Sequence, residues 1–143
     1  SGGEGSVLHY VTGIPTTDSQ ASLGTTGTYT LLGGGVTDSS GTSGSITSAS
    51  MSVSFSSAKV TSLAVGMNVG GNYNISASNL PISGFGTAPV FSGSGSVTGA
   101  GCGSGCSSAN ISGAFFGAGA ARAGVSFDFY GGQYVAGAVA LTK

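Results

Sequence analysis

Hydrophobic and polar residues alternate with a period of two along most of this chain. The clearest runs place apolar residues at Met51, Val53 and Phe55, at Leu63, Val65, Met67 and Val69, and at Val125, Phe127 and Phe129. Strict alternation is typical of antiparallel strands that bury one face and expose the other. Clusters of Gly, Asn, Asp and Ser separate the runs, as hairpin turns do.

This pattern predicts strands near residues 6–12, 25–32, 45–56, 58–69, 72–79, 90–98, 108–116, 124–130 and 133–142. Eight or nine strands at this spacing predict an all-β fold, and we expect a small antiparallel up-and-down β-barrel. Closure is favoured because an open sheet with so few lysines would leave its edges unguarded.

Two segments depart from the alternation. The alanine-rich stretch 118–123 predicts one short helical turn, and the Thr- and Gly-rich stretch 33–44 predicts a long exposed loop. We expect residues 1–5 to form a flexible N-terminal segment and residues 6–143 to form a single β-barrel domain.

Charge is scarce: only 5% of the 143 residues are charged, and the net charge is −1. A Gly- and Ser-rich chain is often disordered, but 39% hydrophobic residues with little net charge favour a folded domain. Three basic residues are too few for a nucleic-acid surface, which needs several phosphate contacts. No apolar run approaches the length of a membrane-spanning helix.

The two cysteines, Cys102 and Cys106, enclose Gly-Ser-Gly. We favour a disulfide across this small loop, which indicates an oxidising, exported location. Free thiols, a redox pair and a metal site are the alternatives. A structural zinc site has four ligands, and this chain offers at most its two cysteines and His9.

Catalytic chemistry finds little support in the sequence. His9 lies in an apolar run, and no Gly-x-Ser-x-Gly elbow stands between a strand and a helix. Of the carboxylates, only Asp128 falls on a predicted strand, where its alternation with Phe127 and Phe129 turns it towards solvent. We therefore expect no enzyme activity, no catalytic residues, no metal site and no cofactor.

A resemblance rests on the C-terminal third of the chain. Residues Ile111–Phe127 (ISGAFFGAGAARAGVSF) and Tyr134–Leu141 (YVAGAVAL) resemble the closing strands of the eight-stranded barrel of bacterial transferrin-binding-protein-like surface proteins. They are more closely similar to the C-terminal barrel of exported FecR-domain proteins. Val7–Pro15 and Gly27–Leu31 resemble the opening strands of that group.

The resemblance implies a compact barrel that is exported to the bacterial surface, the periplasm or the extracellular space, and that binds or supports other proteins. We therefore expect a non-enzymatic module acting through protein–protein contacts, with self-assembly into oligomers or filaments as one version. The partner is then another protein or another copy of the chain. Nucleic acid and a membrane span are not expected.

Candidate interaction residues come from two places. Val7, Leu8, His9, Tyr10 and Val11 form an extended apolar segment able to pair with another copy's strand edge. Phe115 and Phe116 are adjacent on a predicted strand, so one of them must lie outside the barrel.

The alternative function is binding of a small apolar ligand such as haem inside the barrel. Its candidate ligating or pocket residues are His9, Tyr10, Met51 and Met67.

Overall fold

The computed structural model describes residues 16–103 and 105–143, without the side chains of residues 21 and 22. It contains nine strands: β1 (Thr26–Asp38), β2 (Ser43–Ser54), β3 (Lys59–Asn68), β4 (Asn72–Ala77), β5 (Leu80–Ser83), β6 (Val90–Thr98), β7 (Ala109–Phe116), β8 (Arg122–Tyr130) and β9 (Tyr134–Thr142). Short 3₁₀ turns lie at η1 (Gln20–Leu23), η2 (Ala100–Cys102) and η3 (Ala118–Ala120). The helical turn predicted near 118–123 is confirmed by η3.

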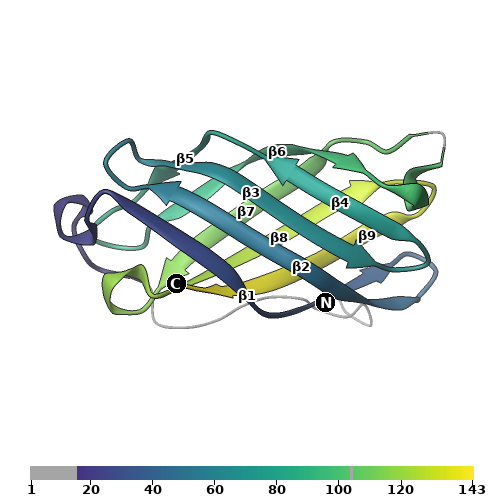
Figure 1. Ribbon diagram of the computed structural model, residues 1–143, viewed down its shortest axis with the longest axis horizontal. Helices are drawn as coiled ribbons and strands as arrows, with labels where there is room; N and C mark the ends of the chain where they lie inside the picture. The colour runs from purple at the N-terminus through teal and green to yellow at the C-terminus, as the bar shows by residue number, and fades with distance from the viewer. Residues whose placement is uncertain (1–15, 104) are drawn as a thin grey trace.

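The strands form one closed antiparallel barrel (Figure 1). The sheet runs β2-β1-β9-β8-β7-β6-β4-β3-β5, and pairing of β2 with β3 closes it. β4 and β5 follow one another between the same two neighbours, β3 and β6, so that the nine strands fill eight positions around the wall. Neighbours in space are neighbours in sequence, which confirms the predicted up-and-down barrel.

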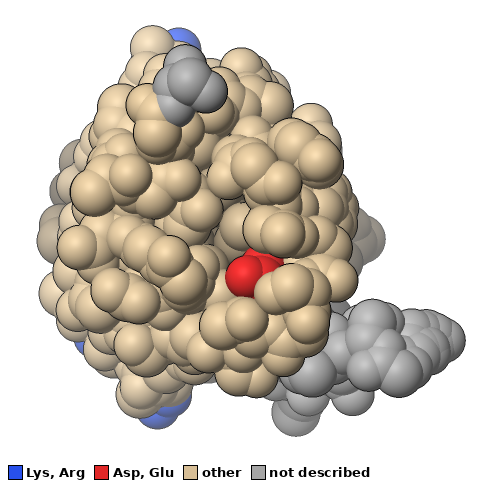
Figure 2. Space-filling view, turned by 90° about the vertical axis from the view of Figure 1, so that its right-hand side faces the viewer, with Lys and Arg blue, Asp and Glu red and all other residues tan. Residues whose placement is uncertain are grey.

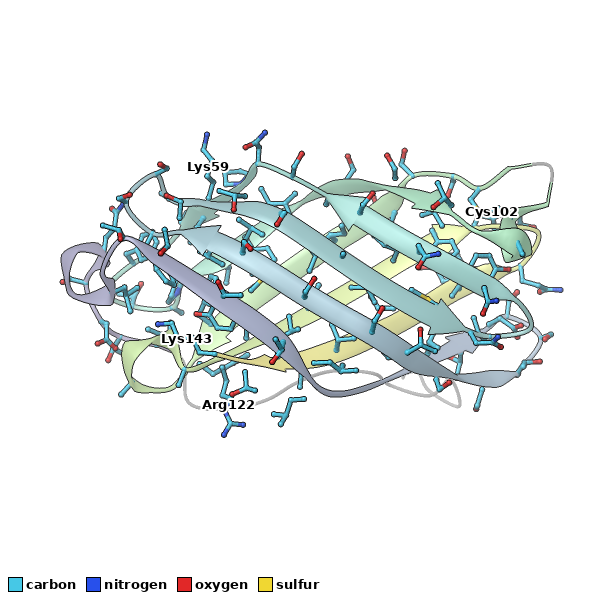
Figure 3. All side chains as sticks on the ribbon, viewed as in Figure 1. Lys59, Cys102, Arg122 and Lys143 are labelled. Carbon is cyan, nitrogen blue, oxygen red and sulfur yellow. A yellow bond between two sulfur atoms is a disulfide. The ribbon has the colours of Figure 1, made fainter. Side chains whose placement is uncertain are left out.

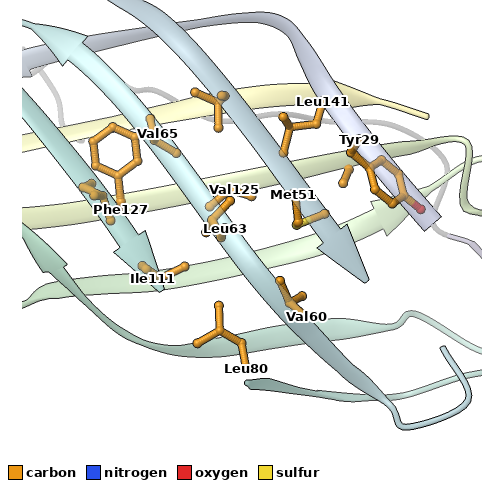
Figure 4. Close-up of a cluster of buried hydrophobic side chains, with 14 of the residues drawn as sticks. Tyr29, Met51, Val60, Leu63, Val65, Leu80, Ile111, Val125, Phe127 and Leu141 are labelled. Atoms are coloured by element: carbon orange, nitrogen blue, oxygen red, sulfur yellow. The ribbon is translucent and has the colours of Figure 1, made fainter. Parts of the chain in front are cut away.

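The alternating apolar residues point inward and fill the barrel (Figure 4). Tyr29, Met51, Leu63, Val65 and Leu141 are each at most 2% exposed. Phe115 lies at the centre of an aromatic group, with ring centroids 5.4 to 5.8 Å from those of Tyr29, Phe55 and Phe91. Burial of these side chains removes apolar surface from water on every strand at once, and so stabilises closure.

The predicted exposed loop at 33–44 is wrong. β1 continues to Asp38 and β2 begins at Ser43, so only four residues form the turn. Val36 is 1% exposed and faces the core. Gly34 fits because its Cα lies against β9: a Cβ there would stand 2.5 Å from the carbonyl oxygen of Ala138. One of the glycines that suggested a loop, Gly34, instead permits close approach of two strands.

The predicted strand 72–79 ends earlier, at Ala77, and a further strand, β5, follows at Leu80–Ser83. Asn79 between them has a positive φ of 56°, which interrupts the extended backbone. Pro81 and this break obscured β5 in the sequence, because proline is rare in central strands. The predicted strand at 6–12 lies outside the described residues.

Both ends of the barrel are crossed by short turns (Figure 1). At one end, η1 and η3 lie near the C-terminus, and Lys143 donates a 2.7 Å hydrogen bond from Nζ to the carbonyl oxygen of Gly119. The same ammonium lies 5.3 Å from the centroid of the Phe55 ring. At the other end, η2 carries the first cysteine (Figure 3).

Candidate functional site on the outer wall

Small side chains gather on the outer face of β7, β8 and β9. One cross-strand row consists of Ala114, Gly124 and Ala140, and the next consists of Ser112, Ser126 and Ala138. Because successive residues in a strand point to opposite faces, these rows point outward while Val125 and Val139 point into the core. We call these two rows with Phe116 the small-residue face.

A shallow recess of about 170 Å³ lies in the small-residue face. Its walls are formed by Ser112, Gly113, Ala114, Phe116, Gly124, Val125, Ser126 and Ala138. None of these residues carries a charge. Phe116 is the largest of them and is partly exposed, so one aromatic side chain lines the recess together with small residues.

Among the described residues, charged side chains lie only at the margins of this face. Arg122 is the Cα partner of both Phe116 and Thr142 at one margin. At the other, Asn110 donates a 2.8 Å hydrogen bond from Nδ2 to the Asp128 carboxylate. The two rows between them contain only glycine, alanine and serine, which lets another chain approach closely without desolvating a charge.

The neighbouring strand β1 adds an exposed apolar residue. Its pairing with β9 shifts by one residue between Leu31 and Gly33, which marks a bulge at Leu32. Leu32 is 53% exposed. β-bulges redirect side chains in this way, and this one turns a leucine outward beside the small-residue face.

The described chain begins next to the recess. Thr16 is fully buried, and its amide donates to the carbonyl oxygen of Phe115 at 3.1 Å. Its Oγ1 donates to the carbonyl oxygen of Gly117 at 2.9 Å. Thr16 is therefore attached to the chain on both sides of Phe116.

The structure separates the predicted interaction residues. Phe115 is 1% exposed in the core, whereas Phe116 is half-buried on the outer wall. The expectation that one of the pair lies outside is thus met by Phe116. Val7, Leu8, His9, Tyr10 and Val11 lie outside the described residues.

The cysteine pair is a disulfide, as the sequence predicted. Cys102 and Cys106 are bonded with their Cα atoms 5.2 Å apart. Cys106 packs on Gly131, where a Cβ would stand 2.7 Å from its Sγ. The disulfide lies within the β6–β7 connection and packs against Gly131 of the β8–β9 turn at one end of the barrel. Cys102 lies far from Lys143 (Figure 3). Its position suits a structural clamp.

The acidic side chains of the described residues accept hydrogen bonds from main-chain, side-chain amide or hydroxyl groups. Asp18 accepts from the Gly119 amide at 3.2 Å. Asp38 accepts from the hydroxyl of Ser40 and from the amides of Ser40 and Thr42. The Ser40 hydroxyl in particular lowers the pKa of Asp38 below its usual value.

Two tyrosines have altered acidity. Burial raises the pKa of Tyr29 well above its usual value, and its hydroxyl donates to the carbonyl oxygen of Ala120 at 2.6 Å. Burial, and then the neighbouring Asp128 carboxylate, raise the pKa of Tyr134. Within residues 16–103 and 105–143, no three His, Cys, Asp or Glu side chains lie close enough to hold a metal ion.

Sequence reasoning missed the recess because serine, alanine and glycine are common on the solvent-facing side of a strand and do not by themselves indicate a binding surface. The usable signal was the absence of any bulky residue at the alternating positions of β9, where Ala136, Ala138 and Ala140 follow one another. The sequence did not show which strands place these positions side by side. The register of the barrel strands decides that.

Comparisons of the chain with family models, with curated proteins and with solved structures gave no significant match. Among the described residues, no helix is long and apolar enough to cross a membrane.

Proposed function

We propose that this protein is a non-enzymatic, exported barrel module that acts through protein–protein contacts on its small-residue face, including contacts between copies. The recess beside Phe116 is the observation that carries this proposal. A wall of Gly, Ala and Ser residues beside one aromatic side chain gives a partner chain close backbone contact and one apolar anchor. Aromatic anchors in pockets supply much of the energy of protein interfaces.

The sparse charge supports the same function. Figure 2 shows one end of the molecule, where the described surface is almost entirely neutral. Such a surface has little like-charge repulsion to keep copies apart. The disulfide adds support for an oxidising, exported location, since such bonds persist mainly outside the reducing cytoplasm.

The filled interior of the barrel favours a function in protein–protein contacts over one in ligand binding. Met51 and Met67, the described candidates for a haem pocket, are each 1% exposed and pack within the core cluster. Tyr29 is also buried, and its hydroxyl already has a main-chain partner. Side chains of this size occupy the space that a ligand would need in an eight-stranded barrel.

Sedimentation velocity over a range of protein concentrations tests the proposal. We expect the wild-type sedimentation coefficient to rise with concentration, because copies associate through the small-residue face. Ala114→Arg places a charged side chain in the recess wall and should keep the protein monomeric. The matched control is Ala64→Arg, on the exposed outer face of β3, which should associate like the wild type.

Circular dichroism would establish that both variants keep the barrel. A wild-type protein that stays monomeric at the highest soluble concentration would contradict self-association. Association that Ala114→Arg leaves unchanged would contradict the recess as its site.

A further inference from the structure

Two tyrosines lie side by side on the outer wall at the end of the β8–β9 hairpin. Tyr130 and Tyr134 are direct cross-strand partners, and they are 58% and 45% exposed. Their chain neighbours Phe129 and Val135 are buried in the core, so both tyrosine side chains lie on the outer face. Of the described aromatic side chains, these two are the exposed ones. The exposed aromatic area of the described chain is therefore concentrated at one place.

The main chain of each tyrosine is fixed by a serine from a neighbouring connection. Ser107 donates its amide to the carbonyl oxygen of Tyr130 at 2.8 Å, and its Oγ accepts from the Tyr130 amide at 2.9 Å. Ser39 makes the same two bonds to Tyr134, at 2.8 and 3.2 Å.

These bonds turn the amide and carbonyl groups of the two tyrosines away from each other, which makes Tyr130 and Tyr134 a non-hydrogen-bonded pair. In such a pair the Cα atoms are about 4.5 Å apart and the side chains are at their closest. The two aromatic side chains are thus held next to each other on a backbone that is already fixed before a ligand binds.

Planar polar side chains lie beside the pair. Asp128 precedes Tyr130 by two residues on β8 and is the diagonal neighbour of Tyr134 on β9, whose hydroxyl donates a hydrogen bond to the Asp128 carboxylate. From β7, Asn110 Nδ2 donates to the same carboxylate at 2.8 Å. A carboxylate has about four acceptor positions and an amide has two donors and an acceptor, so both groups keep capacity for a ligand.

The surroundings of the pair are polar and almost free of charge. The cross-strand row beside the tyrosines consists of Thr37, Ala136, Asp128, Asn110 and Ser94. Four of these five side chains can form hydrogen bonds, and the carboxylate is the only charge among them. An apolar partner surface would leave these groups without hydrogen-bond partners, and an anionic ligand would be repelled by the carboxylate.

A neutral sugar matches both parts of this surface. One face of a pyranose ring consists of C–H groups, which pack on an aromatic ring. Its edge carries neighbouring hydroxyl groups, which a planar carboxylate or amide binds through its paired polar atoms. The two adjacent tyrosines can receive adjacent parts of an oligosaccharide.

We propose that Tyr130 and Tyr134, together with Asp128 and Asn110, bind a neutral oligosaccharide, with sugar rings stacked on the tyrosines and hydroxyl groups bound by the two polar side chains. The site lies beyond the Asp128 margin of the small-residue face, two outer rows from Ser126. The proposal goes beyond protein–protein contacts and does not rest on self-association, because sugar binding is measured on the monomer.

Isothermal titration calorimetry with neutral hexasaccharides tests the proposal. The probes are cellohexaose, maltohexaose, mannohexaose and chitohexaose, which differ in linkage and in the orientation or substitution of their hydroxyl groups. We expect at least one of them to bind the wild-type protein with a saturable heat. Tyr130→Ala and Tyr134→Ala should each weaken that binding about tenfold or more, because each removes an aromatic contact with the sugar.

The matched control is Val90→Ala, because Val90 is 45% exposed, like Tyr134, but lies beside Ala114 at the other end of β7 from Asn110. It should bind the sugar like the wild type. Tyr134→Phe keeps the ring and should lose less affinity than Tyr134→Ala. Asp128→Asn keeps the planar shape but removes the charge, and should also weaken binding. Circular dichroism would establish that every variant keeps the barrel.

Absence of saturable binding to all four probes would overturn the proposal. So would binding that Tyr130→Ala and Tyr134→Ala leave unchanged. If no probe binds and these variants instead reduce association in sedimentation velocity, the tyrosines belong to a contact between copies and the sugar site is wrong. Sugar binding by a protein that never associates would support this proposal and contradict self-association.

Discussion

Individual glycines determine how closely the strands of this barrel pack on their neighbours. Gly113 on β7 is the direct cross-strand partner of Phe91 on β6. A Cβ at position 113 would lie 2.2 Å from the Cζ atom of Phe91 and within 2.7 Å of both Cε atoms. The aromatic ring therefore lies over the glycine, and it also packs against Phe115.

We expect Gly113→Ala to lower the free energy of unfolding by about 1–3 kcal/mol, because the new methyl group overpacks the core against a ring with little freedom to move. Urea denaturation measures the change. The control is Gly33→Ala, at a strand position where a Cβ would have no neighbour within 4 Å. That variant should have nearly wild-type stability, and equal losses in the two variants would contradict the packing explanation.

At the scale of elements, short connections hold the ends of the barrel. The Cys102–Cys106 disulfide follows η2 and contacts the β8–β9 turn through Gly131. At the other end, Gln20 in η1 donates from Nε2 to the carbonyl oxygen of Phe55 at 2.6 Å. These contacts are made by the segments that connect the strands. The hydrogen-bond ladders between the strands do not depend on them. Breaking one should loosen an end and leave the barrel closed.

Replacing Cys102 and Cys106 together with serine should lower the free energy of unfolding by about 2 kcal/mol, the loop-closure entropy of a ring this small. The circular dichroism spectrum should stay that of the folded barrel. Thermal denaturation with and without reductant measures the effect in the unsubstituted protein. Complete unfolding on reduction would contradict a clamp that acts only at one end.

The elements also show where sequence patterns succeed and fail. Alternation predicted β2, β3, β6, β7, β8 and β9 to within a few residues, because each buries one face in the core. The β1 extension through Gly33–Gly35 was invisible to that pattern, since a glycine has no side chain to alternate. β5 was missed because only four residues form it, with Pro81 among them.

For the whole molecule, the small number of titratable groups limits the dependence of stability on pH. The shifted groups of the described chain are Asp38, with a lowered pKa, and Tyr29 and Tyr134, with raised pKa values. Stability from Asp38 is present above the ordinary Asp value of 3.8 and is lost as the pH falls through the lower folded pKa. The tyrosines keep their protons in the folded state above pH 10.0, where the unfolded chain releases them.

We therefore expect a plateau of stability that falls below about pH 4 and again above about pH 10. Urea midpoints measured across the pH range would show it. Asp38→Asn should flatten the acidic fall, and Tyr29→Phe should flatten part of the alkaline fall. If the urea midpoint of Tyr29→Phe falls above pH 10 as much as that of the wild type, the burial of Tyr29 does not cause the alkaline loss of stability.

By itself, the sequence determined the class of fold, the inward faces of most strands and the cysteine pair. Those features follow from local chemistry: alternating apolar residues need a common core, and two cysteines four residues apart lie within bonding reach. Only the tertiary structure decided that Gly124, Ala138 and Phe116 share one recess. Register between strands brings such residues together, and register depends on how every strand packs around the core rather than on any one segment.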